Sequence, residues 1–254
     1  MSNDSDTPTE AGSPGVPSTL LPLFPTTTTT RPVKATTTTL AVASGATVLT
    51  PPATGVYVYS VDGTETLSGS GSRKLPGSMR VTAQRTGAAA DEIVLDLVLS
   101  DRHREREVLA YKRDGVALRY ADLDVAFSLG TRASSATYRP LVARAVAPFA
   151  SGATRSGVSE ALDGAGHAVR TEDWKVTDVG PRTLLGVSTW QITSERSSRA
   201  GATEQLTESR TAWFDPARRV FVKWQTHLRL QRATGTARTY DLTYTAVLTG
   251  FTPA

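Results

Sequence analysis

From residue 55 to the end of the chain, hydrophobic and polar residues alternate with a period of two. In the stretch 92–100, for example, every second residue is apolar (Ile93, Leu95, Leu97 and Leu99). Side chains of a strand point alternately to the two faces of its sheet, so this pattern predicts antiparallel strands with one buried and one solvated face. Similar alternation covers 56–61, 79–86, 103–112, 116–129, 183–195, 205–214, 220–230 and 238–251.

Short turn sequences separate several of these predicted strands. Asp62-Gly63 and Asp114-Gly115 are typical of hairpin turns, and 215–219 joins two strands that would face each other. Because such strands follow one another along the chain, we expect an all-β fold with a minor α part. Its core would be a strongly curved antiparallel sheet or an open, incomplete barrel.

The minor α part is predicted at 139–150. Leu141, Ala145 and Phe149 lie at i, i+4 and i+8, the spacing of one helical face, and Pro148 would shorten or kink such a helix. We therefore expect a short helical segment that joins two loosely similar β-rich halves. These halves are 55–138 and 155–254.

The first 54 residues differ in composition from the rest. They contain eight of the fourteen Pro residues and a single aromatic residue, Phe24, and nine of the fourteen positions in 26–39 are Thr. Such a segment buries too little apolar surface to offset the entropy lost on ordering. We therefore expect a disordered Thr/Pro-rich linker or stalk at 1–54, ahead of a β domain at 55–254. Thr/Pro tracts also occur as glycosylated stalks outside cells.

The location of the protein is indicated only indirectly. No basic region precedes an apolar stretch, so no signal peptide is visible, and no apolar run approaches the ~20 residues that span a bilayer. A literal reading of the first residues indicates a cytoplasmic protein. A Thr/Pro-rich linker ahead of a Cys-free β domain is, however, the layout of exported proteins, so we expect an extracellular or cell-envelope location and no transmembrane segment.

Composition excludes several classes of function. The 254 residues include no Cys, which excludes disulfide scaffolds, thiolate catalysis and Cys-ligated zinc or iron–sulfur centres. The net charge is +4, from 28 Lys and Arg against 24 Asp and Glu, and the two signs are interspersed. Nucleic-acid-binding proteins usually gather their positive charge in one patch, so we expect no nucleic-acid partner.

The sequence does not indicate a catalytic or metal centre. In the run 102–107, His103, Glu105 and Glu107 would share one strand face, as ligands of a metal could. Three arginines alternate with them, so we interpret this run as a solvated, charged strand whose two carboxylates form cross-strand salt bridges. The chain has no Gly-x-Ser-x-Gly elbow either. We expect no enzymatic activity, no metal and no cofactor.

The aromatic residues give the one positive indication of a binding site. All four Trp residues lie between positions 174 and 224. Trp190 and Trp224 fall on apolar strand faces, as core residues do, whereas Trp213 falls on a polar face, where an exposed Trp usually has a partner. The candidate ligand-binding residues are Tyr57, Tyr59, Trp190, Trp213 and Trp224.

The stretch from Trp190 to Trp224 carries a family resemblance. A strand near Trp190 is followed by 208–216 (Glu-Ser-Arg-Thr-Ala-Trp-Phe-Asp-Pro) and by the return strand 220–224 (Val-Phe-Val-Lys-Trp). This arrangement resembles a hairpin of cell-envelope proteins in the lipoprotein-carrier (LolA-like) superfamily, which includes mycobacterial lipid-binding lipoproteins. The resemblance implies an incomplete barrel that is plugged by helices and binds acyl chains or lipidated partners. It implies no catalytic residues, and the chain lacks a lipobox Cys.

Three hypotheses for the function follow. The first is a non-enzymatic cell-envelope or extracellular module that holds a lipid-like ligand, such as an acyl chain, on the concave face of the sheet. The second is a stalk-displayed domain with a filled core that binds a protein partner, for example another envelope protein. The third is a hydrolase whose triad is assembled only in space. A cavity with an open mouth favours the first hypothesis, and a filled interior favours the second.

Overall fold

Strands account for nearly all of the chain whose structure is described. The computed structural model describes residues 49–87, 91–127, 130–202, 204–232 and 238–254, and within these ranges it contains thirteen strands and no helix. The strands are β1 (Gly55–Leu67), β2 (Gly71–Lys74), β3 (Ser78–Arg85), β4 (Glu92–Val98), β5 (His103–Lys112), β6 (Gly115–Phe127), β7 (Gly130–Val146), β8 (Thr154–Leu162), β9 (Ala168–Leu184), β10 (Val187–Ser198), β11 (Glu204–Asp215), β12 (Val220–Arg232) and β13 (Arg238–Pro253).

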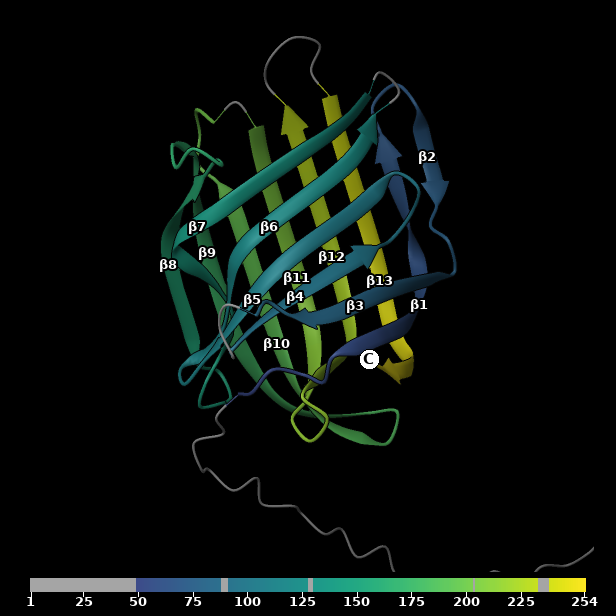
Figure 1. The fold of residues 1–254 in the computed structure, drawn as a ribbon, viewed down its shortest axis with the longest axis vertical. Helices are drawn as coiled ribbons and strands as arrows, with labels where there is room; N and C mark the ends of the chain where they lie inside the picture. Colours follow the sequence, from purple (N-terminus) through teal and green to yellow (C-terminus); the bar gives the residue numbers. More distant parts are fainter. Residues whose placement is uncertain (1–48, 88–90, 128–129, 203, 233–237) are drawn as a thin grey trace, which may run out of the picture. The chain divides into compact units, whose positions relative to one another are not determined.

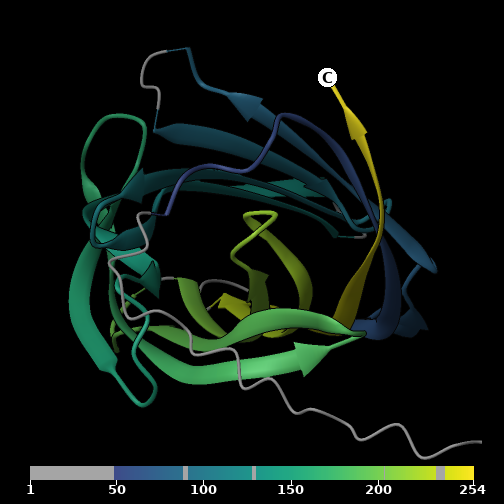
Figure 2. The same cartoon turned by 90° about the horizontal axis from the view of Figure 1, so that it is seen from below.

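The sheet closes on itself as a barrel. The strands pair antiparallel in the order β13-β12-β11-β10-β9-β8-β7-β6-β5-β4-β3-β1-β2, and β13 also pairs with β1. The ring therefore contains twelve strands, and β2 and β3 pair with successive parts of one edge of β1. Figure 2 shows the strands following one another around this ring. The expected all-β antiparallel sheet is confirmed.

The expectation of an open or incomplete barrel is wrong, because β1 and β13 pair along the whole of β1, from Gly55 opposite Pro253 to Leu67 opposite Tyr240. A period of two reports only that one strand face is buried, and this is equally true of an open sheet and of a closed barrel. Closure also gives hydrogen-bond partners to the two strands that an open sheet would leave as edges.

The two sides of the barrel pack directly against each other. In Figure 1, β3–β7 run obliquely across the front of β9–β13, so inward-facing side chains of the two groups meet in the interior. Among the least exposed are Met79, Ile93, Leu118, Ile192 and Leu242. The described residues of the apolar faces predicted for β4, β6, β12 and β13 belong to this one core or pack against it.

The helical segment expected at 139–150 is wrong. Residues through Val146 continue β7, and Ala145 and Val142 pair with Val116 and Leu118 of β6. The i, i+4 spacing is a weak local signal in a segment with two Pro residues. Pairing with a neighbouring strand of complementary apolar pattern overrides it.

The hairpin turn expected at Asp62-Gly63 is also wrong, because β1 runs straight through it and Gly63 pairs with Tyr244. A Cβ atom built on Gly63 would lie 2.3 Å from the carbonyl oxygen of Thr243. Gly63 therefore lets β1 and β13 approach closely. Glycine within a strand can mark such a close approach of two backbones as well as a turn. The turn expected at Asp114-Gly115 is confirmed between β5 and β6.

β1 begins at Gly55, the first residue of the predicted β domain. Residues 1–48 of the expected linker lie outside the described residues. Leu49 and Pro52 are buried, and Leu49, 4% exposed, belongs to the hydrophobic core. The last residues assigned to the linker therefore pack as part of the barrel. The strands of the two expected halves likewise belong to one continuous sheet.

Candidate functional site

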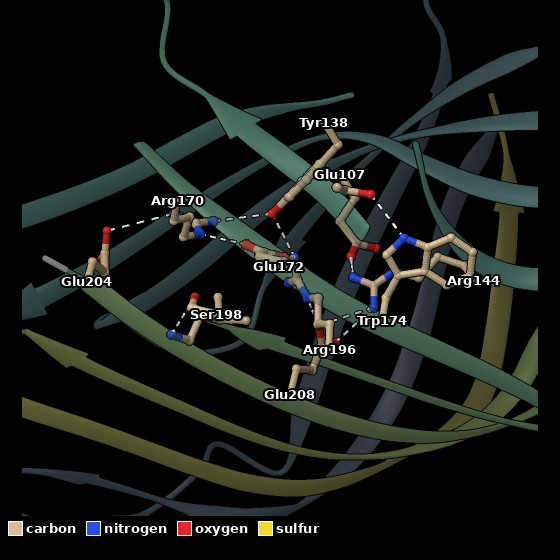
Figure 3. A network of polar contacts seen from close by, with 12 residues as sticks. Glu107, Tyr138, Arg144, Arg170, Glu172, Trp174, Arg196, Ser198, Glu204 and Glu208 are labelled. Carbon is tan, nitrogen blue, oxygen red and sulfur yellow. Dashed lines mark hydrogen bonds and ion pairs between the residues drawn. The ribbon is translucent and has the colours of Figure 1, made fainter. Parts of the chain in front are cut away.

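The interior of the barrel contains a network of buried charged side chains. Arg144 of β7 donates to Glu107 of β5 (Nη2 to Oε1, 2.5 Å) and to Glu208 of β11 (Nη1 to Oε2, 3.1 Å). Glu208 also pairs with Arg196 and with Arg210, whose Nη2 atom lies 3.0 Å from Oε1. Figure 3 shows most of these side chains pointing toward one another from strands on opposite sides of the barrel.

The network continues through Tyr138 to β9. The Tyr138 hydroxyl accepts hydrogen bonds from Arg196 (Nη1, 2.7 Å) and Arg170 (Nη2, 3.3 Å). Arg170 also donates through Nε to Glu172 (2.5 Å), and Nη1 of Arg196 lies 3.7 Å from Glu172. Figure 3 shows this branch beside Glu204, to which Arg170 forms a longer ion pair. Ionic contacts therefore link β5, β7, β9, β10 and β11 inside the barrel.

Neighbouring arginines keep Glu208 charged although it is buried. Burial alone would raise the pKa of Glu208, but the guanidinium groups of Arg144, Arg196 and Arg210 hold that pKa well below its usual range. Charges that have been removed from water in this way are costly to leave unpaired. The network therefore fixes the mutual register of the two sides of the barrel, and its groups are already engaged with one another.

His103 lies at a second polar cluster in the interior. Its Nδ1 atom is 3.0 Å from the Tyr240 hydroxyl, which donates to Glu65 (3.0 Å to Oε2), and its Nε2 atom is 3.8 Å from Glu105. Burial would raise the pKa of Glu105, but the hydrogen bond with His103 and the charge of Arg210 lower it overall. Both ring nitrogens of His103 thus face protein groups.

The interpretation of 102–107 as a solvated strand is wrong for one of its faces. His103 and Glu107 are both 2% exposed, and Glu107 pairs with Arg144 and Arg210 rather than with the neighbouring arginines. Both faces of this strand are charged, so alternation could not show which face is inside. Its partners come from distant strands. Among the described residues no group of three His, Asp or Glu side chains is arranged to hold a metal ion.

The remaining space inside the barrel is small. One cavity of about 40 Å³ lies between apolar side chains such as Leu109, Ile192 and Trp224 and the charged groups of Arg144 and Arg210. Pockets that enclose small molecules usually measure roughly 300–1,000 Å³, whereas a few water molecules fit a cavity of this size. Side chains therefore fill most of the interior.

Three of the candidate ligand-binding residues lie together in the packed core. Tyr57 and Tyr59 of β1 are 5% and 3% exposed, and their hydroxyls donate to the carbonyl oxygens of Ala53 (2.9 Å) and Phe221 (3.0 Å). The Tyr59 ring lies 4.4 Å from that of Trp224, whose Nε1 donates to Tyr244. Their polar atoms are thus satisfied within the protein. A role in ligand binding stays a prediction.

The other two candidates lie apart from this group. Trp190 is buried and stacks on Phe149 with 5.1 Å between ring centroids, and its Nε1 atom has no partner among the described residues. Trp213 lies half-buried on the outer face of β11, where the Lys223 ammonium sits 4.7 Å from the ring centroid. Trp213 therefore lies on the polar strand face, as predicted. The ammonium group of Lys223 already covers its ring.

Sequence reasoning missed an opening in the barrel wall between β7 and β8. These strands pair only over Thr137–Arg139 and Glu160–Leu162. On its other side, β7 carries a bulge in which 138–141 lie opposite the single residue Arg119 of β6. Bulges of this kind bend a strand and end its pairing, and Pro140 within it has no N–H to donate. Pro140 in an otherwise strand-like pattern was the available signal.

The strand edges on the two sides of this opening have backbone N–H and C=O groups without a strand partner. Beyond the bulge, the segment 142–146 of β7 pairs only with β6, and 154–159 of β8 pairs only with β9. A hollow of about 390 Å³ lies at this position. Its apolar lining includes Leu141, Ala143 and Trp174. We call this hollow, with its two strand edges, the β7–β8 opening.

Charged side chains surround the β7–β8 opening. Lys112, Asp114, Arg139 and Arg155 line the hollow, and all four are exposed. Within the described part of the chain, the structure records no ion pair for Lys112, Arg139 or Arg155. The rim therefore carries an excess of positive charge. These groups contrast with the interior network, where each charge already has an opposite partner.

Asp178 of β9 forms hydrogen bonds with the connection between β7 and β8, residues 147–153. Its backbone N–H donates to Ala153 (2.8 Å), its carbonyl accepts from Gly152 (2.6 Å), and its Oδ2 atom accepts from the Ala150 N–H (3.3 Å). Burial raises the pKa of Asp178 to about 6, against smaller opposing effects of the Ala150 hydrogen bond and of the charge of Arg155. Its Oδ1 atom has no partner among the described residues.

A larger but shallower hollow of about 590 Å³ lies over the outer faces of β8–β11. Its side chains include hydroxyl groups and charges of both signs, such as Lys175 beside Glu195 and Asp173 beside Arg199 (2.7 Å). Every backbone here is paired on both sides, apart from the edge of β8 described above. Apart from that edge, this face has no unpaired strand backbone, and the charges that line it are of both signs.

Comparison of the chain with protein-family models, curated proteins and solved structures gives no match. Among the residues described, no helix has the length and apolar character needed to span a bilayer. The resemblance to the lipoprotein-carrier superfamily stays a prediction. The geometry of the barrel is therefore the basis for an inference about function.

Proposed function

We propose that the chain is a non-enzymatic recognition domain that binds a protein partner on the outside of its barrel. The observation that carries this proposal is the filled interior. The cavity found in the interior, among the described residues, measures about 40 Å³, far less than an acyl chain needs. Of the functions considered from the sequence, a filled interior favours the interaction domain over the lipid carrier.

The chemistry of the interior supports a binding role rather than a catalytic one. Glu208 is held charged by three arginines, and His103 has Tyr240 and Glu105 at its two ring nitrogens. Groups that are already paired in this way stabilise a fold, whereas general acids and bases need access to a reacting group. The accessible features lie outside, at the β7–β8 opening.

The Thr/Pro-rich segment 1–54, which we expect to act as a flexible linker or stalk for the barrel, is part of the same proposal. A Thr/Pro-rich segment of the length of 1–54 gives a tethered domain a reach on the order of 40 Å if it behaves as a flexible chain. Such a tether suits a domain that meets partners at an extracellular or cell-envelope surface. The excess of positive charge among the residues that line the β7–β8 opening supports a protein surface rather than an apolar ligand as its partner.

The test combines native mass spectrometry with peptide selection. The full chain is purified from a bacterial host and weighed before and after extraction with organic solvent, and a displayed peptide library is selected against it. We expect the mass of the polypeptide alone and a set of peptides that bind the folded chain. A lipid that is released by the solvent would overturn the proposal in favour of a lipid carrier. Failure to select any peptide that binds the folded chain would also overturn it.

A further inference from the structure

We propose that the β7–β8 opening is a strand-addition site that takes an extended, acidic segment of a partner protein. This inference rests on the proposed recognition function and names its site and the chemistry of its occupant. It is carried by three independent observations: unpaired backbone on two neighbouring strands, an apolar hollow between them, and a rim with excess positive charge.

The unpaired backbone supplies the binding energy. The segments 142–146 of β7 and 154–159 of β8 each have a strand partner on one side only. The N–H and C=O groups on the other side of each strand are a template for an added strand, which forms main-chain hydrogen bonds with it. Five or six residues in extended form span roughly 17–20 Å, a typical strand length.

The hollow sets the side-chain pattern of the occupant. Its floor contains Leu141 and Ala143 of β7 and the ring of Trp174, which packs against Gly157 of β8. A Cβ on Gly157 would lie 2.4 Å from that ring, so the glycine makes room for it. Alternate side chains of an added strand would point to this apolar floor, and the others would point outward to the rim.

The rim selects an acidic occupant. Among the residues that line the hollow, Lys112, Arg139 and Arg155 outnumber the single acid Asp114, and no ion pair is recorded for these three cations among the described residues. Glu160 opposite Arg139 and Asp178 near Arg155 offset part of this charge. Carboxylates at the outward positions of the added strand would complement them, which increases both association rate and specificity. A second copy of the same opening would bring like charges together, so the rim disfavours edge-to-edge pairing of two barrels.

The experiment uses the full chain and a fluorescent probe peptide of about eight residues in which Val and Glu alternate. Fluorescence anisotropy measures binding, and hydrogen exchange with mass spectrometry measures protection of the backbone amides. We expect saturable binding at low salt, with protection gained in 142–146 and 154–159. A peptide with Lys in place of Glu should bind at least about tenfold more weakly. The Val-Glu peptide with alternate amides N-methylated should not bind, because it cannot complete the ladder.

Charge reversal of the protein provides the second arm. Arg139→Glu combined with Arg155→Glu should weaken binding of the Val-Glu peptide at least about tenfold and reverse the preference toward the Lys peptide. Arg80→Glu is the matched control, since Arg80 is an exposed arginine on β3. We expect it to leave binding unchanged. Circular dichroism checks that each variant is folded.

Three outcomes would overturn the inference. The first is binding that is insensitive to the double charge reversal or to N-methylation. The second is binding without new protection in either strand edge. The third is strong protection of 142–146 in the free chain, which would mean that the chain itself or a second copy fills the opening. If selected peptides bind elsewhere on the barrel, this inference fails while the proposed recognition function stands.

Discussion

Arg196 of β10 and Glu208 of β11 are direct cross-strand partners, and their side chains form an ion pair inside the barrel. At most 5% of either side chain is exposed. Glu208 also receives Arg144 from β7 on the opposite side of the interior. The pair therefore joins a local feature, the register of two adjacent strands, to a global one, the packing of the two sides of the barrel.

The first prediction concerns this pair. Glu208→Gln keeps the shape of the side chain but leaves three arginines without a shared counter-charge, so we expect it to lower the free energy of unfolding by about 3–5 kcal/mol. Glu195→Gln is the control, because Glu195 lies on the outer face of the adjacent strand and is exposed. It should change stability by about 0.5 kcal/mol or less. Denaturant unfolding measures both, and equal effects of the two variants would contradict the role assigned to the network.

A second prediction concerns the close approach of β1 and β13. Gly63→Ala places a methyl group against the backbone of Thr243, which cannot move without disturbing the strand pairing that closes the barrel. We expect a loss of more than about 2 kcal/mol in the free energy of unfolding. Gly77→Ala is the matched control, since nothing lies within 4 Å of a Cβ there. Thermal or denaturant unfolding that gave the two variants the same stability would remove the physical reason given for Gly63.

These two predictions mark the limit of what the sequence could establish. Alternation identified the buried faces of β4, β6, β12 and β13, because burial of one strand face is a local property. It could not identify closure between β1 and β13, since that depends on two segments almost two hundred residues apart. For the same reason Gly63 was taken for a turn residue: its partner, Thr243, is invisible to a local pattern.

The candidate site was harder to predict for a related reason. The charges of 102–107 suggested a solvated strand, whereas His103 and Glu107 face inward to groups from β7, β11 and β13. The β7–β8 opening depends on a bulge at 138–141, and the Ala- and Leu-containing sequence there suggested a helix instead. Trp213 was placed on the correct strand face because that question needs only the period of two.

A third prediction separates the tryptophans. Trp224→Leu removes a buried ring that contacts Tyr59 and leaves a cavity, so we expect a loss of about 3–5 kcal/mol in the free energy of unfolding. Trp213→Leu removes a half-buried ring and its contact with Lys223, for which about 1 kcal/mol is expected. Denaturant unfolding compares them. A loss for Trp213→Leu as large as that for Trp224→Leu would place Trp213 in the core instead of on the surface.

The last prediction concerns pH and the connection beside the β7–β8 opening. The pKa of Asp178 is about 6 in the folded protein, against about 4 for an unfolded chain, so the folded state holds this proton more tightly. The contribution of Asp178 to the free energy of unfolding should therefore fall as pH rises from about 4 to about 6. Above that range this contribution should stay constant. Asp178→Asn keeps an acceptor for the Ala150 N–H and carries no charge.

We expect Asp178→Asn to abolish this part of the pH dependence. The difference in free energy of unfolding between the variant and the unmodified chain should therefore favour the variant more at pH 7 than at pH 4. Asp173→Asn on the same strand is the control with the opposite sign. The hydrogen bond with Arg199 lowers the pKa of Asp173, so its contribution is present above pH ~4 and is lost as pH falls further. Chemical unfolding between pH 3 and pH 8 distinguishes the two variants. If both gave the same pH profile, the burial of Asp178 beneath the β7–β8 connection would not be the cause of its raised pKa.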